Sequence, residues 1–203
     1  DGDHTSQACI PSDSVSEAYL LVKDSGVLAG LDVAKYVFEH YASDVVFTQH
    51  LKDGDEISFG DIAFDIKCRT RDILKLERFV LNTMQRMSGI ASFSRKYAAC
   101  VSDLDVEILD TRKTTPLLRA IEKEAVRIGG CSNYRFGLYD WIMIKDNHIT
   151  AAGSVKKAIQ SVHEYLSRNQ LELDITVEVR NQKELISAMD VGGFRRIMLD
   201  NFL

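Results

Sequence analysis

Hydrophobic and polar positions along the chain predict two kinds of structure, one after the other. Residues 62–68 alternate apolar and polar side chains as a half-buried strand does, and residues 18–22 and 45–51 predict two further strands. Residues 33–41 carry apolar side chains at helical spacing. Residues 73–100 predict one long helix, whose apolar stripe contains Leu76, Val80, Met84, Met87 and Ala91. The first part of the chain is therefore predicted to be α+β with a small sheet.

Strands and helices alternate in the second part. Four apolar runs predict strands, with helices between them, at residues 106–110, 141–145, 173–179 and 196–200. Thr115 and Pro116 predict the start of the first of these helices, and Gly129-Gly130 its end. Alternation of this kind indicates a parallel sheet, either open or closed into a barrel. The two parts are predicted to meet between residues 95 and 105.

Composition narrows the class of protein. The 203 residues are 27% charged and 45% apolar, which is typical of a folded globular chain. A net charge of −5 argues against a general nucleic-acid-binding surface. The apolar runs are too short for a transmembrane helix, and no signal-peptide pattern is visible. The four cysteines lie far apart without a CxxC pair, which favours reduced thiols in a cytoplasm over a zinc site or a disulfide framework.

Each of the four apolar runs in the second part is associated with charged groups. Asp110, Lys145 and Asp200 directly follow a run, and Glu178 alternates away from the aliphatic residues around it. The C-terminal ends of parallel strands face the binding crevice in α/β folds. Both signs of charge favour a polyanion site, with cations for the substrate and carboxylates for a metal or hydroxyl groups. The alternative is that charges resume wherever a strand reaches water.

The densest group of candidates is the run of Arg112, Lys113, Thr114 and Thr115. Arginine offers a planar fork for carboxylate or phosphate, lysine a point charge, and the hydroxyls precede a helix N-terminus. No Walker loop, GxGxxG, GxSxG or HExxH motif occurs. His148 could act as an acid or base, but a lone histidine after a strand is more typical of a hydrogen-bonded structural residue.

Eight strings occur in the order of a known family. They are DGDHTS (1–6), ERFVLN (77–82), QRMSGIA (85–91), ILDTRKTTP (108–116), NYRFGLYD (133–140), IKDNHI (144–149), VEV (177–179) and MLDNF (198–202). Together they resemble nicotinate-nucleotide pyrophosphorylase (carboxylating), also called quinolinate phosphoribosyltransferase. The resemblance covers essentially the whole chain, and the strings at 110–116 and 145–149 are the most specific.

The resemblance implies an α/β fold in two domains. An N-terminal α+β sandwich that includes the long helix would occupy residues 1–101. A parallel α/β barrel would occupy residues 102–203 and is incomplete in this chain, because four strands cannot close a barrel. The last residues, 197–203, have the pattern of a buried strand, and the sequence ends directly after them. The family's glycine-rich phosphate-binding segment is absent from this sequence. We therefore expect that one or both ends are missing from this sequence.

The resemblance also implies an activity. Enzymes of this family are cytoplasmic pentosyltransferases of de novo NAD biosynthesis. They make nicotinate mononucleotide, pyrophosphate and CO2 from quinolinate and phosphoribosyl pyrophosphate (PRPP), and they require Mg²⁺. They work as homodimers, or as oligomers built from dimers, with shared active sites.

Matching motifs assign roles to seven residues. Arg112, Arg135 and Lys145 would bind the quinolinate carboxylates, and Arg78 would reach into the partner subunit's site. The catalytic candidates Lys113, Glu178 and Asp200 would serve the phosphoribosyl end, where Mg²⁺ would arrive mainly on PRPP and lie near Glu178 and Asp200.

The chemistry of the reaction agrees with these residue types. Quinolinate is a dianion, for which forked arginines are the natural receptor. Carboxylates can stabilise the positive charge that develops on the ribose. The family commonly has histidine where this chain has Tyr134, so a phenol replaces an imidazole there.

Two alternatives stay open at this point. A paralogue of the same fold, such as the protein associated with molybdenum transport operons, would take another pyridine-like substrate, but it would not need four cations (Arg78, Arg112, Arg135, Lys145). The second alternative is a binding module of another class, a biotinyl or lipoyl carrier. Residues 52–62 of this chain resemble the hairpin of such carriers and include an Asp53-Gly54 turn signal. Such a carrier needs a modifiable lysine beside small or methionine residues at a tight turn, and that tripeptide does not occur.

Overall fold

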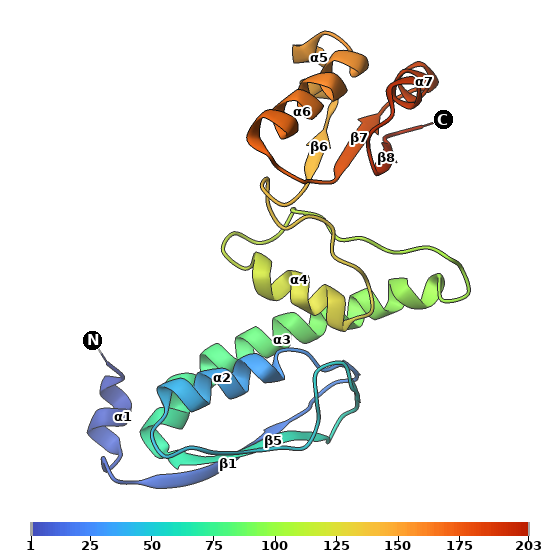
Figure 1. Ribbon diagram of the computed structural model, residues 1–203. Coiled ribbons are helices and arrows are strands. Elements are labelled where there is room, and N and C mark those ends of the chain that lie inside the picture. The colour runs from blue at the N-terminus through green and yellow to red at the C-terminus, as the bar shows by residue number, and fades with distance from the viewer. Residues whose placement is uncertain (1, 203) are drawn as a thin grey trace. The chain divides into compact units, whose positions relative to one another are not determined.

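The chain divides into two compact units, Asp1–Tyr134 and Arg135–Leu203, and the computed structural model describes residues 2–202 (Figure 1). The first unit contains α1 (His4–Cys9), β1 (Val15–Leu21), β2 (Gly26–Val27), α2 (Leu31–Tyr41), β3 (Val46–Gln49), β4 (Glu56–Ile57), β5 (Ile62–Arg69), α3 (Thr70–Cys100) and α4 (Arg119–Ile128). The second contains β6 (Ile142–Ile144), α5 (Asp146–Ala152), α6 (Val155–Asn169), β7 (Ile175–Val179), α7 (Gln182–Val191) and β8 (Arg196–Leu199). The boundary between the compact units falls after Tyr134, because α4 packs along α3 and therefore belongs to the first unit. The domain boundary expected at 101/102 stays a prediction.

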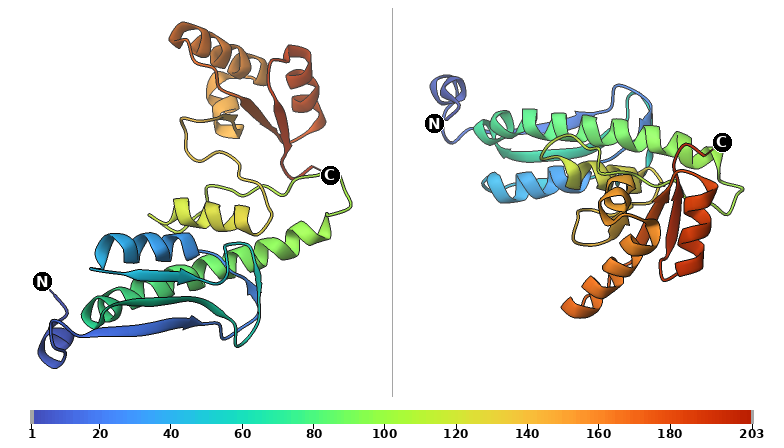
Figure 2. Two further views of the ribbon diagram at one scale, coloured as in Figure 1. Left: turned by 60° about the horizontal axis from the view of Figure 1, so that its bottom comes forward. Right: turned by 90° about the horizontal axis from the view of Figure 1, so that it is seen from above.

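The first unit is built in two layers, a sheet and helices. Its antiparallel sheet has the order β1-β5-β3, and α2 and α3 cover one face of it (Figure 2). The central strand β5 turns Phe64, Ile66 and Cys68 into the core between the layers, as its alternation predicts. The long helix is confirmed, with its apolar stripe buried (Leu76, Val80, Met84, Met87, Ala91).

The Asp53-Gly54 turn does not close a hairpin between the strands on either side of it. Strand β3 pairs with β5, and β4 pairs with β2. The Asp53 carboxylate instead accepts the backbone N–H of Leu31 at 2.8 Å, at the start of α2. Burial raises the pKa of this carboxyl group despite the hydrogen bonds to it. The local turn signal is overridden by longer-range pairing, which removes the structural basis of the carrier interpretation.

Two predicted elements near the start of the second part differ in the structure. Residues 106–110 form no strand but only a parallel bridge between Leu109 and Ser132. The pairing does not continue because Asn133 and Tyr134, which follow Ser132, donate hydrogen bonds to the side chain of Asp110. The following helix begins at Arg119 rather than after Thr115. Leu117 has a φ of 66°, which is incompatible with a right-handed helix, so the helix cannot start before this residue. Gly129 and Gly130 end this helix as predicted.

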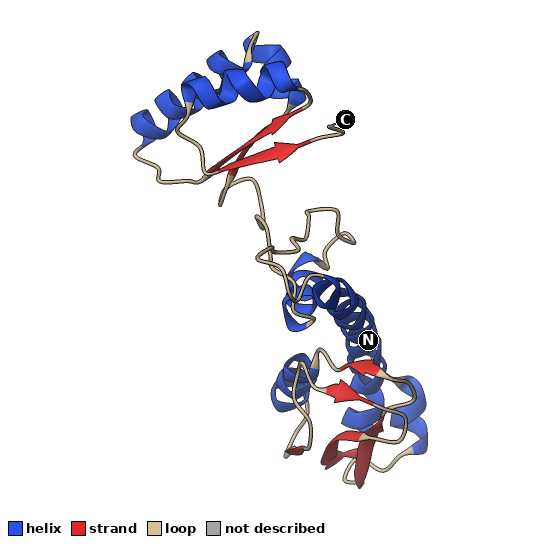
Figure 3. Ribbon diagram, turned by 90° about the vertical axis from the view of Figure 1, so that its right-hand side faces the viewer, coloured by secondary structure: helices blue, strands red, loops and turns tan. Residues whose placement is uncertain are grey.

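The second unit is a parallel sheet covered by helices on one face. Its strand order is β6-β7-β8, with Ile144 opposite Val177 and Val177 opposite Ile197. Helices α5, α6 and α7 pack on one side of the strands (Figure 3). Because strand side chains alternate, Val177 and Val179 are buried against these helices while Glu178 projects from the other face. The predicted parallel α/β arrangement is confirmed for these three strands.

The cysteines fall into two pairs by exposure. Cys68 and Cys131 are buried, Cys9 and Cys100 are exposed, and all four are free thiols. Burial raises the pKa of the Cys68 and Cys131 thiols. In residues 2–202, no helix has the length and apolar character that crossing a lipid bilayer requires.

Candidate functional site

The carboxyl-terminal edge of the parallel sheet brings three of the predicted residues to neighbouring strand ends. Lys145 follows β6, Glu178 is the fourth residue of β7, and Asp200 follows β8. Lys145 Nζ lies 3.2 Å from Glu178 Oε2, and the Glu178 side chain is 12% exposed. The backbone N–H of Asp200 donates to Val179 O at 2.9 Å, which fixes its place beside β7. The prediction that charged strand ends share one edge is confirmed for these three.

A packed polar layer supports this edge from below. Thr176 lies two residues before Glu178 on the same face of β7 and is fully buried. The indole N–H of Trp141 donates to Thr176 Oγ1 at 2.9 Å, and the guanidinium of Arg196 lies 5.2 Å from the centre of the indole ring. Because this layer spans all three strand segments, it restrains the face from which Glu178 projects.

His148 has a structural role at the same end of the sheet. Its Nδ1 accepts the backbone N–H of Lys145 at 2.9 Å, in a capping box at the start of α5. This contact fixes the backbone of Lys145 and agrees with the structural interpretation of the lone histidine.

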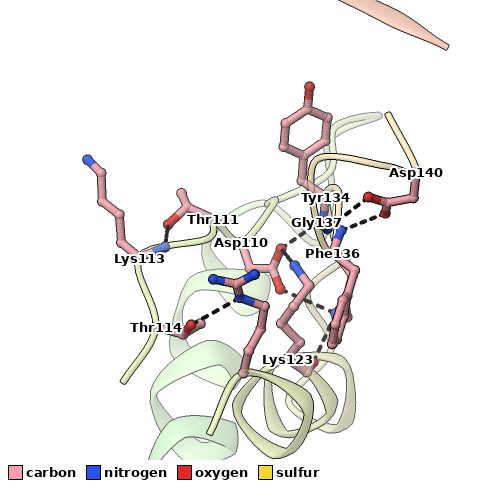
Figure 4. Close-up of polar contacts among 11 residues, drawn as sticks. Asp110, Thr111, Lys113, Thr114, Lys123, Tyr134, Phe136, Gly137 and Asp140 are labelled. Carbon is pink, nitrogen blue, oxygen red and sulfur yellow. Dashed lines mark hydrogen bonds and ion pairs between the residues drawn. The ribbon is translucent and has the colours of Figure 1, made fainter. Parts of the chain in front are cut away.

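Arg112 and Lys113 lie in a loop of the first unit, residues 110–118, which we call the cation loop. The Lys113 side chain extends away from α4, and its backbone N–H donates to Thr111 Oγ1 at 3.1 Å (Figure 4). Within residues 2–202, no protein hydrogen bond or ion pair engages Lys113 Nζ. The Nε of Arg112 is buried and has no hydrogen-bond partner in that range. Arg112 Nε and Lys113 Nζ are therefore two cationic atoms of this loop for which residues 2–202 supply no hydrogen-bond or ion-pair partner.

A buried ion pair fastens the start of the cation loop to α4. Lys123 Nζ lies 2.5 Å from Asp110 Oδ1, and the two side chains are 5% and 8% exposed. The same carboxylate accepts the backbone N–H of Tyr134 at 2.8 Å and the amide of Asn133 at 3.3 Å (Figure 4). Asp110 thus joins the loop to the segment that ends the first unit.

A second buried carboxylate fastens the other end of the loop. Glu122 Oε2 accepts the backbone N–H of Thr115 at 3.1 Å, and Glu122 Oε1 accepts Arg86 Nε at 2.7 Å. Arg86 also donates to Thr115 Oγ1 at 2.6 Å. Burial tends to raise the pKa of the Glu122 carboxyl, but the hydrogen bonds from Arg86 and Thr115 outweigh it and hold the pKa below its ordinary value.

Arg135 is held in a loop of the second unit. It is 9% exposed, and its Nη1 donates to Trp141 O at 3.4 Å. Asp140 organises this loop by accepting the backbone N–H groups of Phe136 at 2.6 Å and Gly137 at 2.8 Å. Burial tends to raise the pKa of Asp140, but these hydrogen bonds and the charge of Arg135 lower it overall.

Arg78 occupies a different setting from the other predicted residues. It lies on the exposed side of α3, next to Phe79, which is 58% exposed. Within the second unit, the structure therefore brings Lys145, Glu178 and Asp200 to one edge of the sheet, and it holds Arg135 in the loop before β6. Within the first unit, it places Arg112 and Lys113 in one loop and Arg78 on α3. Asp110, the fourth charged group expected at a strand end, follows no strand and pairs with Lys123 in the first unit instead. The supporting roles of Glu122, Lys123 and Arg86 were not predicted from the sequence.

Leu117 gives the cation loop a strained backbone conformation. Its φ is 66° and its side chain is fully exposed. The left-handed region costs a residue with a Cβ about 1–2 kcal/mol, part of which glycine's greater unfolded-state freedom would offset. We expect Leu117→Gly to raise the free energy of unfolding by about 0.5–1 kcal/mol in urea titrations. Leu104→Gly, at an exposed leucine without positive φ, should be neutral or destabilising, and equal losses in both variants would contradict the strain.

Two family models match nearly all of the chain. The N-terminal domain of quinolinate phosphoribosyl transferase matches residues 3–88, and its C-terminal domain matches residues 90–203. The chloroplastic nicotinate-nucleotide pyrophosphorylase (carboxylating) of Arabidopsis thaliana is 42% identical over an alignment of 207 positions, which covers 100% of this chain and 59% of the relative. The mitochondrial quinolinate phosphoribosyltransferase (decarboxylating) 2b of Nicotiana tabacum is 41% identical over 100% of this chain and 58% of its own length.

Solved structures agree with the sequence matches. NadC from Streptococcus pyogenes superposes with a TM-score of 0.89 at 40% identity, over 98% of this chain and 69% of that one. The nicotinate-nucleotide pyrophosphorylase of Francisella tularensis gives a TM-score of 0.89 at 34% identity, over 100% of this chain and 70% of that one. The chain spans about three fifths of the length of its plant relatives, and over that span it belongs to the quinolinate phosphoribosyl transferase family.

Proposed function

We propose that the protein is a quinolinate phosphoribosyltransferase, which makes nicotinate mononucleotide, pyrophosphate and CO2 from quinolinate and PRPP. Arg112, Arg135 and Lys145 bind the two carboxylates of quinolinate. Lys113, Glu178 and Asp200 act at the phosphoribosyl end. The names of the relatives and the two family models support this assignment.

The observation that carries the proposal is the contact between Lys145 and Glu178. The reaction joins the pyridine nitrogen to the anomeric carbon of ribose, so the binding sites for the two substrates must adjoin. Lys145 is assigned to quinolinate and Glu178 to the ribose, and their side chains meet at 3.2 Å. A substrate carboxylate bound at this contact would replace Glu178 as the anionic partner of Lys145. Glu178 would then face the ribose.

The unpartnered Nε of Arg112 adds independent support. A buried N–H without a hydrogen-bond acceptor costs about 1–3 kcal/mol, and such groups in a native structure call for an explanation. A bound carboxylate would supply the acceptor and match the planar guanidinium. The position of this atom therefore fits the predicted role of Arg112 toward a dianionic substrate.

The chemistry needs charge stabilisation more than proton transfer. As the bond from ribose to pyrophosphate breaks, positive charge builds at the anomeric carbon, and the carboxylates of Glu178 and Asp200 stabilise it. The pyridine nitrogen then forms the new bond and becomes cationic. When the 2-carboxylate leaves as CO2, its bonding electron pair stays on the ring carbon beside this cationic nitrogen. A proton then binds this electron pair and takes the place of the carboxylate on the ring carbon.

The donor set fits Mg²⁺ that arrives with PRPP. Residues 2–202 contain no group of three or more His, Cys, Asp or Glu side chains arranged to hold a metal ion. Mg²⁺ is commonly bound through substrate phosphates, waters and one or two carboxylates, and Glu178 and Asp200 offer such oxygens. When bound, Mg²⁺ neutralises the pyrophosphate leaving group.

Substrate discrimination tests the proposal. The full-length protein should form nicotinate mononucleotide from quinolinate, but kcat/KM for nicotinate should be at least roughly 100-fold lower, because nicotinate lacks one of the two carboxylates that the cations bind. Product formation followed by chromatography at saturating PRPP and Mg²⁺ measures both. Comparable turnover of nicotinate would rule out the assignment.

We propose further that the active enzyme is a dimer in which Arg78 serves the partner subunit's site. Its exposed position on α3 supports this role. Inactive Arg78→Ala and inactive Lys113→Ala proteins, mixed so that subunits exchange, should recover about a quarter of wild-type activity. Half of the dimers are then hybrids, and each hybrid contains one intact site.

The matched control for this experiment is a mixture of Lys113→Ala with Lys145→Ala. These two residues serve the site of their own subunit, so both sites of the hybrid carry a defect and no activity should return. Absence of recovery in the Arg78 mixture, after exchange is verified by mass spectrometry, would exclude the shared site.

We propose a cytoplasmic location, which the free thiols support because stable disulfides are rare in that compartment. The plant relatives carry chloroplastic or mitochondrial in their names.

A further inference from the structure

The cation loop is held by a closed network that joins α3, α4 and the loop itself. Glu122 on α4 accepts hydrogen bonds from Arg86 on α3 and from the backbone of Thr115, and Arg86 also donates to the hydroxyl of Thr115. Each of the three residues therefore contacts the other two. Thr115 lies two residues after Lys113 in the chain, so the network fixes the backbone immediately beyond the two cations.

We propose that Glu122 is a positioning residue, whose carboxylate holds the cation loop in the conformation that presents Arg112 and Lys113 to substrate. The proposal rests on the proposed function, because it assigns those two cations to quinolinate and PRPP.

Burial separates Glu122 from an ordinary surface charge. The residue is 7% exposed, and its carboxylate is saturated by three donors on two other elements. The Arg86 side chain is 46% exposed, so only the Glu122 side of this ion pair is buried. Such a pair is seldom more stabilising than a well-packed apolar pair of the same size, so packing of α3 on α4 alone does not require these charges. Directional hydrogen bonds to a loop backbone do require them.

Within the loop, the Lys113 N–H donates to Thr111 Oγ1 at 3.1 Å, and Arg119 Nε donates to Thr114 Oγ1 at 3.3 Å. Lys123 and Asp110 hold its start, and Glu122 holds Thr115. Between these anchors Lys113 is exposed, and after them Leu117 lies in the left-handed region that its side chain disfavours. The anchors hold the two ends of the segment that carries Arg112 and Lys113, so its conformation depends on them as well as on the contacts within the loop.

The first test compares Glu122→Gln with Glu124→Gln in the full-length protein. Glu124 is a matched control because it also accepts hydrogen bonds from an arginine, Arg127, but that pair lies on the exposed side of one helix. Below the unfolding temperature, Glu122→Gln should weaken quinolinate binding in calorimetry at least tenfold and raise KM for quinolinate by a similar factor. Glu124→Gln should change neither. A lower Tm with unchanged quinolinate affinity and kcat would overturn the proposal in favour of a packing role.

The second test removes the charges but keeps the packing. The double variant Arg86→Met with Glu122→Leu replaces the ion pair with apolar side chains of similar size, so it keeps the test usable if Glu122→Gln folds poorly. It should retain the folded structure by circular dichroism and still lose quinolinate affinity at least tenfold. Wild-type affinity in this folded variant would overturn the proposal.

Amide hydrogen exchange separates failure of this proposal from failure of the proposed function. Exchange of residues 111–117 should accelerate at least tenfold in Glu122→Gln, with no change in the protected centre of α3, and should stay at the wild-type rate in Glu124→Gln. Unchanged exchange in the loop overturns the positioning role whatever the substrate. If exchange accelerates in Glu122→Gln but the wild-type protein does not bind quinolinate, Glu122 remains the anchor of the loop and the proposed function is wrong.

Discussion

Glu178→Gln and Asp200→Asn are each expected to lower kcat at least about tenfold, which corresponds to an increase in the activation barrier of roughly 1.4 kcal/mol. Both carboxylates stand at the edge of the parallel sheet. In the function proposed above, they stabilise the positive charge that develops on the ribose in the transition state. A group that acts mainly in the transition state lowers kcat and kcat/KM together when it is removed. Quinolinate binding should stay near normal, because an anion does not favour a dianionic pyridine.

Asp174→Asn is the matched control for these variants. Asp174 directly precedes β7, at the opposite end from Glu178, and lies 3.4 Å from Arg195, so this variant also removes a carboxylate from an ion pair beside the same strand. Its kcat should stay within about twofold of wild type, since surface ion pairs contribute little. Steady-state kinetics and calorimetry with quinolinate distinguish the cases. Lost quinolinate affinity with an intact kcat would reverse the roles assigned to Glu178 and Asp200.

Lys123→Met is expected to destabilise the protein by about 3–5 kcal/mol, the largest effect on folding that we anticipate. The substitution leaves the Asp110 carboxylate buried without its counter-ion, although Tyr134 still donates to it. The double variant Asp110→Asn with Lys123→Met removes both charges and should recover most of the loss. Free energies of unfolding from urea titrations give both values.

A surface pair provides the comparison for Lys123. Lys35 lies 3.9 Å from Glu39 on α2, and both side chains are more than two fifths exposed. Lys35→Met should therefore change the free energy of unfolding by less than about 0.5 kcal/mol. A loss below 1 kcal/mol in Lys123→Met would show that the buried pair is not important for folding.

Much of the fold could be predicted because its signals are periodic and local. The apolar stripe of α3 and the alternation of β5 identify the core of the first unit, and both are buried as expected. Parallel strands place their carboxyl ends at one edge, so the charged residues of the four apolar runs were expected there. Lys145, Glu178 and Asp200 do lie at that edge, but Asp110 follows no strand. These features depend on the sequence of one element at a time.

Of the residues that periodicity missed, Lys123 is buried by loops, and Glu122 is buried by a loop together with the neighbouring helix α3. At 3.6 residues per turn, Lys123 lies about 200° around α4 from Ile121, on the side that a helical pattern assigns to solvent. It is buried because the cation loop and the segment ending at Tyr134 cover that side. Glu122 is buried by its contacts with Arg86 and Thr115. Such contacts join distant positions, so no local pattern predicts them.

The same limit explains the errors in the predicted elements. Thr115 and Pro116 carry a helix-start signal, but Glu122 and Arg86 bind Thr115 in the loop conformation, and the helix begins four residues later. Asp53 and Gly54 carry a turn signal, but the carboxylate of Asp53 binds the start of α2. In both cases a tertiary hydrogen bond outweighs the local preference.

The two classes of thiol also give the protein a built-in reporter of its own opening. The thiolate is the nucleophile that attacks alkylating reagents, so the exposed Cys9 and Cys100 are available for alkylation in the native state. Cys68 lies in the core between α2, α3 and the sheet, and Cys131 lies just after α4, and burial raises the pKa of both. Their alkylation has to wait until the surrounding structure opens, and its rate therefore follows the free energy of that opening at each buried position. Cys68 reads the opening of the sheet core, and Cys131 reads the release of α4 from α3, the helix on whose attachment the cation loop depends.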